Sequence, residues 1–227
     1  MFNIENLEKI KEVAPHVQIV AVSKFASVND IFSAYYAGVK HFGESKVQHL
    51  IEKSKEINSI GNNEDLCWHF IGRLQSNKIK QLFTVSNLKY IHSVDSLKLL
   101  KELYQKQALL NQNKVKFFLQ INTSLEKEKG GVIDRDSLFE MINYILSQKK
   151  AQLEFIGLMT ISRLRSCDFA KDADECFLKL TNYKKEIERT FPISSLKLSM
   201  GMSQDYHIAV KYGTDFLRIG SALFENH

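Results

Sequence analysis

The chain has 227 residues, of which 44% are hydrophobic and 25% are charged, a composition typical of a folded globular protein. Its formal net charge of +5 comes from scattered lysines, and no basic stripe with interleaved aromatic residues indicates a nucleic-acid partner. No apolar run approaches the roughly 20 residues that a membrane-spanning helix needs. The N-terminus lacks the apolar core of a signal peptide. We therefore expect a cytoplasmic protein with neither a nucleic-acid nor a membrane partner.

Short apolar runs alternate along the chain with segments of helical periodicity. The apolar runs, which are rich in β-branched residues, predict strands at residues 17–23, 41–44, 68–72, 90–94, 115–122, 155–161, 196–200 and 216–219. The intervening patterns predict helices at residues 29–37, 45–57, 77–83, 96–109, 135–146, 168–189 and 204–211. Each strand is therefore followed by a helix or by a segment of similar length.

The predicted strands are apolar on both faces, as the run VQIVAVS illustrates, and this is typical of parallel strands covered on both sides. Eight such units predict an α/β fold, a closed (β/α)₈ TIM barrel that forms a single domain over residues 1–227. An open doubly wound sheet is the alternative. No G-x-G-x-x-G motif opens the first helix to support that alternative.

Lys24 lies at the end of the first predicted strand, within the stretch AVSKFASVND. In a TIM barrel the carboxyl ends of the strands form the face that carries the active site. Glu44, Arg73 and Arg218 belong to the ends of other predicted strands, so polar side chains gather at one rim. A lysine at this place is either a solvated strand end or an amine kept for its chemistry, and its position leaves both readings open.

Small residues cluster after the last two predicted strands, as 199–203 (SMGMS) and as Gly220 and Ser221. Exposed backbone N–H groups in such loops bind anions, and these are the loops where TIM barrels commonly hold a phosphate. The small residues also permit tight turns without any ligand. Together with Lys24, they suggest a phosphorylated carbonyl compound bound as a Schiff base. Partial burial and a nearby cation such as Arg218 would lower the pKa of the lysine amine, as its attack on a carbonyl requires. A class I aldolase-like enzyme and a pyridoxal phosphate protein both remain open.

Eight stretches that cover nearly the whole chain, in order, resemble one known family. They are AVSK (21–24), HFGES (41–45), WHFIGRLQSNK (68–78), IHSVDS (91–96), QINTS (120–124), GLMTI (157–161), LSMGMSQD (198–205) and RIGSALF (218–224). The chain resembles in these stretches the pyridoxal phosphate homeostasis proteins, which are alanine-racemase-like single-domain barrels without the extra β-domain of racemases. The resemblance favours the pyridoxal phosphate protein over the aldolase.

The resemblance also implies a cofactor site. Lys24 would form the internal aldimine with pyridoxal 5′-phosphate, and Arg218 would face the pyridine nitrogen. The phosphate cup and its surroundings would be formed by Ser199, Met202, Ser203, Gly220 and Ser221. Asn77 and His69 would line the same rim, with His69 equally explained as a buried structural histidine. We expect no catalytic residue and no metal, since His41, His92 and His207 have no partner at metal-ligand spacing and the three cysteines show no metal motif.

The implied function is a carrier that takes part in intracellular vitamin B6 homeostasis, with no robust turnover. Its expected partners are the cofactor itself and pyridoxal-phosphate-dependent apoenzymes as acceptors, and we expect a monomer. The alternative is an amino-acid racemase, which needs a second base, usually a tyrosine, from an extra β-domain that this chain has no room for. An arginine at the pyridine nitrogen can donate a hydrogen bond but does not protonate the ring, so the cofactor is a poorer electron sink.

Two residues depart from the family pattern near the rim. Ser45 stands where the family usually has an asparagine after Gly43 and Glu44, and Arg73 replaces a usual proline. Neither departure touches the lysine, the arginine or the small-residue loops.

Overall fold

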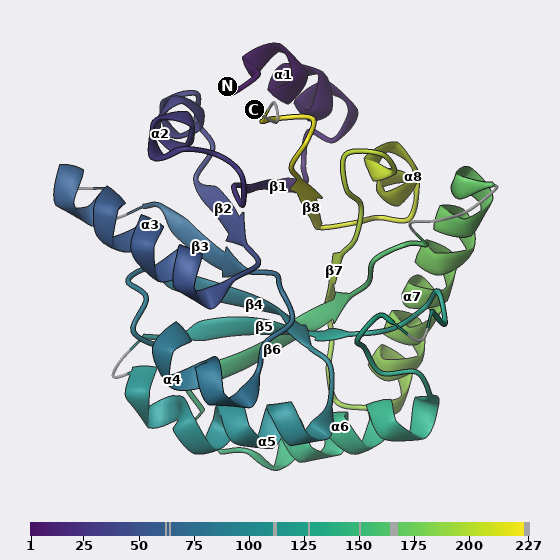
Figure 1. Cartoon of the computed structure of the whole chain (residues 1–227). Helices are drawn as coiled ribbons and strands as arrows, with labels where there is room; N and C mark the ends of the chain where they lie inside the picture. The colour runs from purple at the N-terminus through teal and green to yellow at the C-terminus, as the bar shows by residue number, and fades with distance from the viewer. Residues whose placement is uncertain are drawn as a thin grey trace.

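The computed structural model describes residues 1–61, 63, 65–110, 113–126, 128–149, 151–163 and 168–224. Its centre is a closed barrel of eight strands that pair in sequence order, each parallel to its neighbours, with β8 closing against β1 (Figure 1). The strands are β1 (Gln18–Val22), β2 (His41–Glu44), β3 (Cys67–Phe70), β4 (Leu88–Val94), β5 (Val115–Gln120), β6 (Leu153–Met159), β7 (Lys197–Ser199) and β8 (Phe216–Ile219). The TIM-barrel prediction is confirmed.

Helices surround the barrel (Figure 1). The described α-helices are α1 (Ile4–Val13), α2 (Val28–Tyr36), α3 (Val47–Ile60), α4 (Ile79–Leu82), α5 (Leu97–Lys106), α6 (Arg135–Ser147), α7 (Phe169–Thr190) and α8 (Tyr206–Lys211), with short 3₁₀ turns η1 (Ser76–Lys78) and η2 (Gln107–Leu110). Most bounds lie within two or three residues of those predicted from the sequence. Helix α8 starts two residues later than predicted, because Asp205 turns back to bind the backbone N–H of Met202.

Strand residues alternate between two separate cores. Val20 faces the barrel interior with Phe118, Met159 and Phe216, and all four are buried. Their neighbours along the strands, such as Ala21, face outward into the larger core beneath the helices. This division follows from the two-residue period of a strand, and it explains why the strand sequences are apolar on both faces.

Capping residues fix where several helices begin on the rim. Ser27 and Asp30 form a reciprocal capping box at the start of α2, with the Ser27 hydroxyl accepting from the Asp30 backbone N–H. Ser96 caps α5 by accepting from the Leu99 backbone N–H, and Asp134 caps α6 by accepting from the Ser137 backbone N–H. Each cap satisfies a backbone donor that the first turn of a helix leaves unpaired. The loops that carry the polar residues of the rim therefore enter their helices at defined points.

The first and last described segments lie side by side (Figure 1). The Asn3 backbone N–H donates to the Leu223 carbonyl oxygen at 2.8 Å, and the rings of Phe2 and Phe224 are 5.9 Å apart. This contact holds the loop after β8, with Gly220 and Ser221, against α1. Among the described residues, no helix is long and apolar enough to cross a membrane.

Candidate functional site

A cavity of about 430 Å³ opens at the carboxyl ends of β1 and β8. The predicted site residues among those that line it are Lys24, Met202, Ser203, Arg218, Gly220 and Ser221. They come from the loops after β1, β7 and β8 and from β8 itself, which pair around the barrel closure. The fold thus brings into one place residues that are almost 200 positions apart in the chain.

Lys24 stands at the mouth of this cavity and is exposed. Its Nζ lies 4.8 Å from the ring centroid of Phe25, which is itself 73% exposed. The partial burial expected for Lys24 is therefore not found. The amine has no carboxylate partner among the described residues, so it is accessible to a ligand in the cavity and to molecules outside it.

A buried ion pair lies directly beneath Lys24. Glu44, at the end of β2, is fully buried and accepts hydrogen bonds from the Ser23 hydroxyl at 2.8 Å and from Lys53 Nζ at 2.7 Å. Lys53 reaches in from α3 and also donates to the Ser23 carbonyl oxygen at 2.5 Å. Lys53 therefore holds the carbonyl oxygen of the peptide that joins Ser23 to Lys24, while Glu44 holds the Ser23 side chain, and together they fix the place from which the lysine side chain extends.

Arg218 forms the inner wall of the cavity and is only 4% exposed. Its Nη1 donates to Ser199 Oγ at 2.7 Å, and its Nη2 donates to the Thr160 carbonyl oxygen at 2.8 Å. Burial lowers the pKa of the guanidinium to about 10, which still leaves it charged at neutral pH. Among the described residues no carboxylate pairs with it within 4.0 Å, so a buried positive charge faces the cavity.

The loop after β7 has a conformation that its sequence makes possible. Gly201 has φ of +94°, and a Cβ there would lie 2.6 Å from Ala209 Cβ and from Leu217 Cδ2. Only glycine fits both the backbone angle and the space. Ser203 Oγ in turn accepts from the backbone N–H groups of Gly220 at 3.3 Å and Ala222 at 3.2 Å. The two small-residue loops are therefore joined through one hydroxyl.

Asp205 is the anchor of this loop. It is 1% exposed, and its Oδ1 accepts from the Met202 backbone N–H at 2.6 Å. Its Oδ2 accepts from the hydroxyl of Ser162, in the loop after β6. The carboxylate thus ties the cavity wall at Met202 to the neighbouring loop.

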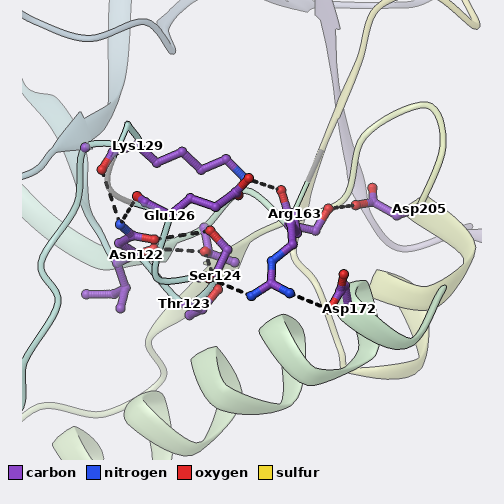
Figure 2. A network of polar contacts seen from close by, with 12 residues as sticks. Asn122, Thr123, Ser124, Glu126, Lys129, Arg163, Asp172 and Asp205 are labelled. Carbon is purple, nitrogen blue, oxygen red and sulfur yellow. Dashed lines mark hydrogen bonds and ion pairs between the residues drawn. The ribbon is translucent and has the colours of Figure 1, made fainter. Parts of the chain in front are cut away.

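Figure 2 shows that this tie continues across the rim into the loop after β5. Lys129 Nζ donates to the Ser162 carbonyl oxygen at 2.6 Å and pairs with the Glu126 carboxylate. Arg163 bridges Asp172 of α7 and the Ser124 carbonyl oxygen, each at 3.1 Å. A continuous polar network therefore holds three successive rim loops in register beside the cavity.

Three predicted site residues do not line the cavity. Ser199 is fully buried behind Arg218, and His69 lies deeper still inside the barrel. Asn77 is exposed on η1 and is absent from the cavity wall. The two residues that depart from the family pattern lie in different cavities. Arg73 lines a separate cavity of about 380 Å³ together with Asp95 and Ser96, whereas Ser45 lines the same cavity as Lys24.

Sequence reasoning missed the histidines of β2 and β4, which have partners after all. His41 Nδ1 lies 2.8 Å from His69 Nε2, and His69 Nδ1 lies 2.8 Å from His92 Nε2. Burial lowers the pKa of His41 to about 4 and holds those of His69 and His92 well below the usual value. The sequence does carry a signal for these residues. Tyr90 and His92 are two residues apart in β4 and therefore lie on the same face of the strand, so a polar side chain at this spacing indicates a polar contact inside the barrel.

No group of three or more potential metal ligands is found among the described residues. Of the three cysteines, Cys67 and Cys176 are free thiols on different elements, and Cys167 lies outside the described residues. The described residues that line the Lys24 cavity present an amine, a guanidinium and serine hydroxyls.

Curated relatives cover most of the chain. The pyridoxal phosphate homeostasis protein of Schizosaccharomyces pombe is 36% identical over 209 residues, which are 92% of this chain and 84% of that protein. The protein of the same name from Synechocystis is 36% identical over 220 residues, 96% of this chain and 94% of that protein.

Solved structures and a family model agree with these matches. PipY of Synechococcus elongatus, solved with pyridoxal phosphate bound, is 33% identical, covers 97% of this chain and 99% of its own, and superposes with a TM-score of 0.84. Alanine racemase of Streptomyces coelicolor, 13% identical with a TM-score of 0.76, covers 96% of this chain and 56% of its own and shows the shared fold. The family model for the alanine racemase N-terminal domain matches residues 4–226. With this barrel, this cavity and relatives of this likeness, the chain belongs to the pyridoxal phosphate homeostasis protein family.

Proposed function

We propose that this protein, as one domain over residues 1–227, binds pyridoxal 5′-phosphate as a Schiff base on Lys24 and takes part in intracellular supply of the cofactor without robust turnover of its own. The observation that carries the proposal is the placement of Lys24, Arg218 and two small-residue loops around one cavity. The bound pyridoxal phosphate in PipY, a relative that covers 97% of this chain, supports it.

The cavity suits such a ligand in size and in the order of its chemical groups. Its volume of about 430 Å³ lies in the range of small-molecule sites. The aldehyde of the cofactor supplies a reversible covalent bond to a primary amine. Lys24 offers that amine at the mouth, where a competing amine from outside can also reach. Holding and later releasing a reactive aldehyde both require this accessibility.

The small-residue loops provide the donors that a phosphate needs. The backbone N–H groups of Ser203 and Ser221 donate to none of the described residues, and Gly201 and Gly220 keep side chains out of the way. Neutral N–H and hydroxyl donors hold a phosphate dianion without requiring a lysine or arginine at that end. In this proposal Met202, Ser203, Gly220 and Ser221 form the phosphate cup.

Arg218 is placed to donate to the pyridine nitrogen. A guanidinium donates but does not accept, and with a pKa of about 10 it does not give up its proton at neutral pH. A ring held this way withdraws electrons weakly, so the residues present favour holding the cofactor over carbanion chemistry. Ser199 and His69 act through Arg218 in this proposal, and we assign Asn77 no contact with the cofactor.

An absorption experiment tests the proposal. The wild type incubated with pyridoxal phosphate and freed of excess should show an aldimine band that borohydride bleaches, and mass spectrometry should place the reduced adduct on Lys24. Lys24→Arg keeps the charge and Lys24→Ala removes it, and both should lack the band. Lys9→Ala, at an exposed lysine of α1, should keep it. A wild type without the band, or an adduct on another lysine, would contradict the proposal.

Carrier and racemase are separated by a second assay. Among the described residues no tyrosine lines the cavity, and Tyr212 hydrogen-bonds Asp174 instead. We therefore expect no D-alanine from L-alanine above the rate of free cofactor, whereas transfer of cofactor to an apoenzyme should proceed from the loaded protein. The loaded protein should elute as a monomer. Formation of D-alanine over many turnovers per protein molecule would favour the racemase.

A further inference from the structure

A line of hydrogen bonds runs through the barrel interior from β2 to Arg218. His41, His69 and His92 lie on the adjacent strands β2, β3 and β4, and each ring nitrogen pair is 2.8 Å apart. His92 Nδ1 then lies 2.8 Å from Ser199 Oγ of β7, which accepts from Arg218 at 2.7 Å. We refer to His41, His69, His92 and Ser199 as the histidine relay.

The relay is shielded from water over most of its length. His69, His92 and Ser199 have no exposed surface, and only His41 at the start of β2 is partly exposed. The Tyr90 ring stacks on His69 at 4.2 Å, and Phe118 lies 4.5 Å from His92. TIM barrels usually fill this space with branched apolar side chains. Buried polar atoms here must satisfy one another, because solvent does not reach them.

Arg218 gives this line a direction. A guanidinium only donates, so Ser199 Oγ must accept from it. The hydroxyl hydrogen of Ser199 then has one described acceptor, Nδ1 of His92. His92 must therefore carry its hydrogen on Nε2 and donate to His69 Nδ1. Because His69 Nδ1 accepts this bond, His69 also carries its hydrogen on Nε2 and donates it to His41 Nδ1. In the opposite direction the Ser199 hydrogen would be buried without an acceptor.

We propose that Arg218 sets His69 and His92 as Nε2–H tautomers, and that the histidine relay in return acts as a positioning unit: it fixes the Ser199 hydroxyl behind Arg218 and thereby holds the guanidinium in one orientation toward the cavity. His92 and His69 are then positioning residues, not cofactor contacts. The neutral state of both rings agrees with this, since burial holds their pKa values well below the usual range. This proposal rests on the proposed function in one respect: that the group which Arg218 faces in the cavity is the pyridine nitrogen of the cofactor.

The tautomers can be measured without any cofactor. Protein labelled with ¹⁵N at its seven histidines is examined by long-range ¹H–¹⁵N correlation, which distinguishes Nδ1–H, Nε2–H and doubly protonated rings. Signals are assigned with single His→Gln variants. We expect His69 and His92 to be wholly Nε2–H at neutral pH. Either ring as Nδ1–H, as a mixture, or as imidazolium would overturn the proposal.

A matched pair of variants tests whether Arg218 is the cause. Arg218→Gln replaces a pure donor with an amide that can donate to Ser199 or accept from it, so both directions become possible and the His92 signal should shift to a tautomer mixture. Arg163→Gln removes a rim arginine that does not touch the relay and should leave the tautomers unchanged. A pure Nε2–H signal in Arg218→Gln would show that the direction is set elsewhere.

The wild-type measurement stands even where Arg218→Gln fails to fold. It also separates this proposal from the cofactor proposal, since the tautomers are read in the cofactor-free protein. A wild type with the expected tautomers but no aldimine band would support the relay and contradict cofactor binding. The expected band with the opposite tautomers would do the reverse.

Discussion

Lys53 Nζ lies 2.5 Å from the carbonyl oxygen of Ser23, the residue that precedes Lys24. The contact joins a surface helix to the backbone that presents the proposed Schiff-base lysine. Its partner Glu44 is fully buried, so the pair is sensitive to the loss of either charge. One lysine of this rim therefore has a structural role, and the neighbouring one is left free for chemistry.

Lys53→Met should destabilise the protein by about 3 kcal/mol, because it leaves the Glu44 carboxylate buried without its cation. Urea denaturation measures the change. Glu44→Gln with Lys53→Met removes both charges and should recover at least half of the loss. A double variant as unstable as the sum of the two single variants would mean that the two groups do not interact.

Lys53→Met should also weaken pyridoxal phosphate binding, since the Ser23–Lys24 peptide loses its support. Lys46→Met, at an exposed lysine just before α3, is the control and should change neither stability nor binding. Equal binding by wild type and Lys53→Met, measured by fluorescence quenching on folded protein, would contradict this positioning role.

Gly201→Ala should disrupt the proposed phosphate cup. The substitution adds a Cβ at φ of +94° and brings it within 2.6 Å of two side chains, so backbone strain and overpacking combine. Gly38→Ala is a matched control, since its φ is +93° but nothing lies within 4 Å of the added Cβ. We expect a loss of about 1 kcal/mol for Gly38→Ala and of about 2–4 kcal/mol for Gly201→Ala.

The two glycine variants should also differ in their affinity for pyridoxal phosphate. Gly201→Ala moves the available backbone N–H group of Ser203, and the dissociation constant for pyridoxal phosphate should rise at least tenfold. Gly38→Ala, far from the cavity, should bind as the wild type does. Titration followed by the aldimine absorbance measures both. Similar affinities in the two variants would place the phosphate elsewhere.

Stability should fall in mild acid because of the buried histidines. Burial lowers the pKa of His41 to about 4 and holds the pKa values of His69 and His92 well below their usual value. Above the unfolded pKa of about 6.5 both states are neutral and stability does not depend on these groups. Below about pH 6.5 these histidines bind protons in the unfolded chain but stay neutral in the folded protein. Each histidine then costs about 1.4 kcal/mol per pH unit until its folded pKa is reached.

Urea denaturation between pH 7.5 and pH 5 checks this slope. His41→Gln keeps a group that can hydrogen-bond His69 but does not titrate. Below pH 6.5 its free energy of unfolding should therefore fall less steeply than that of the wild type, by about 1.4 kcal/mol per pH unit. His49→Gln, at an exposed position of α3, should leave it unchanged. A stability that stays flat from pH 7.5 to pH 5 would contradict the buried neutral state.

Arg218→Lys should keep the positive charge but lose one of the two hydrogen bonds that the guanidinium makes. One ammonium does not reach Ser199 Oγ and the Thr160 carbonyl oxygen in the geometry of the fork. We expect a loss of about 1–3 kcal/mol in stability by urea denaturation. Unchanged stability would mean that the fork geometry does not matter at this site.

The sequence by itself determined the barrel and the candidate lysine. Strands apolar on both faces require cover on both sides, and eight of them in alternation with helices leave few other topologies. Lys24, Arg218 and the small residues of 199–203 and 220–221 could be placed at one rim, because the carboxyl ends of parallel strands meet there. Local patterns sufficed, since the period of a strand and the caps of a helix are local properties.

Only the tertiary structure decided which polar side chains meet. His41, His69 and His92 lie more than 20 residues apart from one another, and nothing in their spacing shows that the inward positions of three adjacent strands bring them to 2.8 Å. The Glu44–Lys53 pair and the exposure of Lys24 were equally hidden, because burial depends on how α3 and the rim loops pack. Contacts across a closed barrel are set by strand register and stagger, which no single strand encodes.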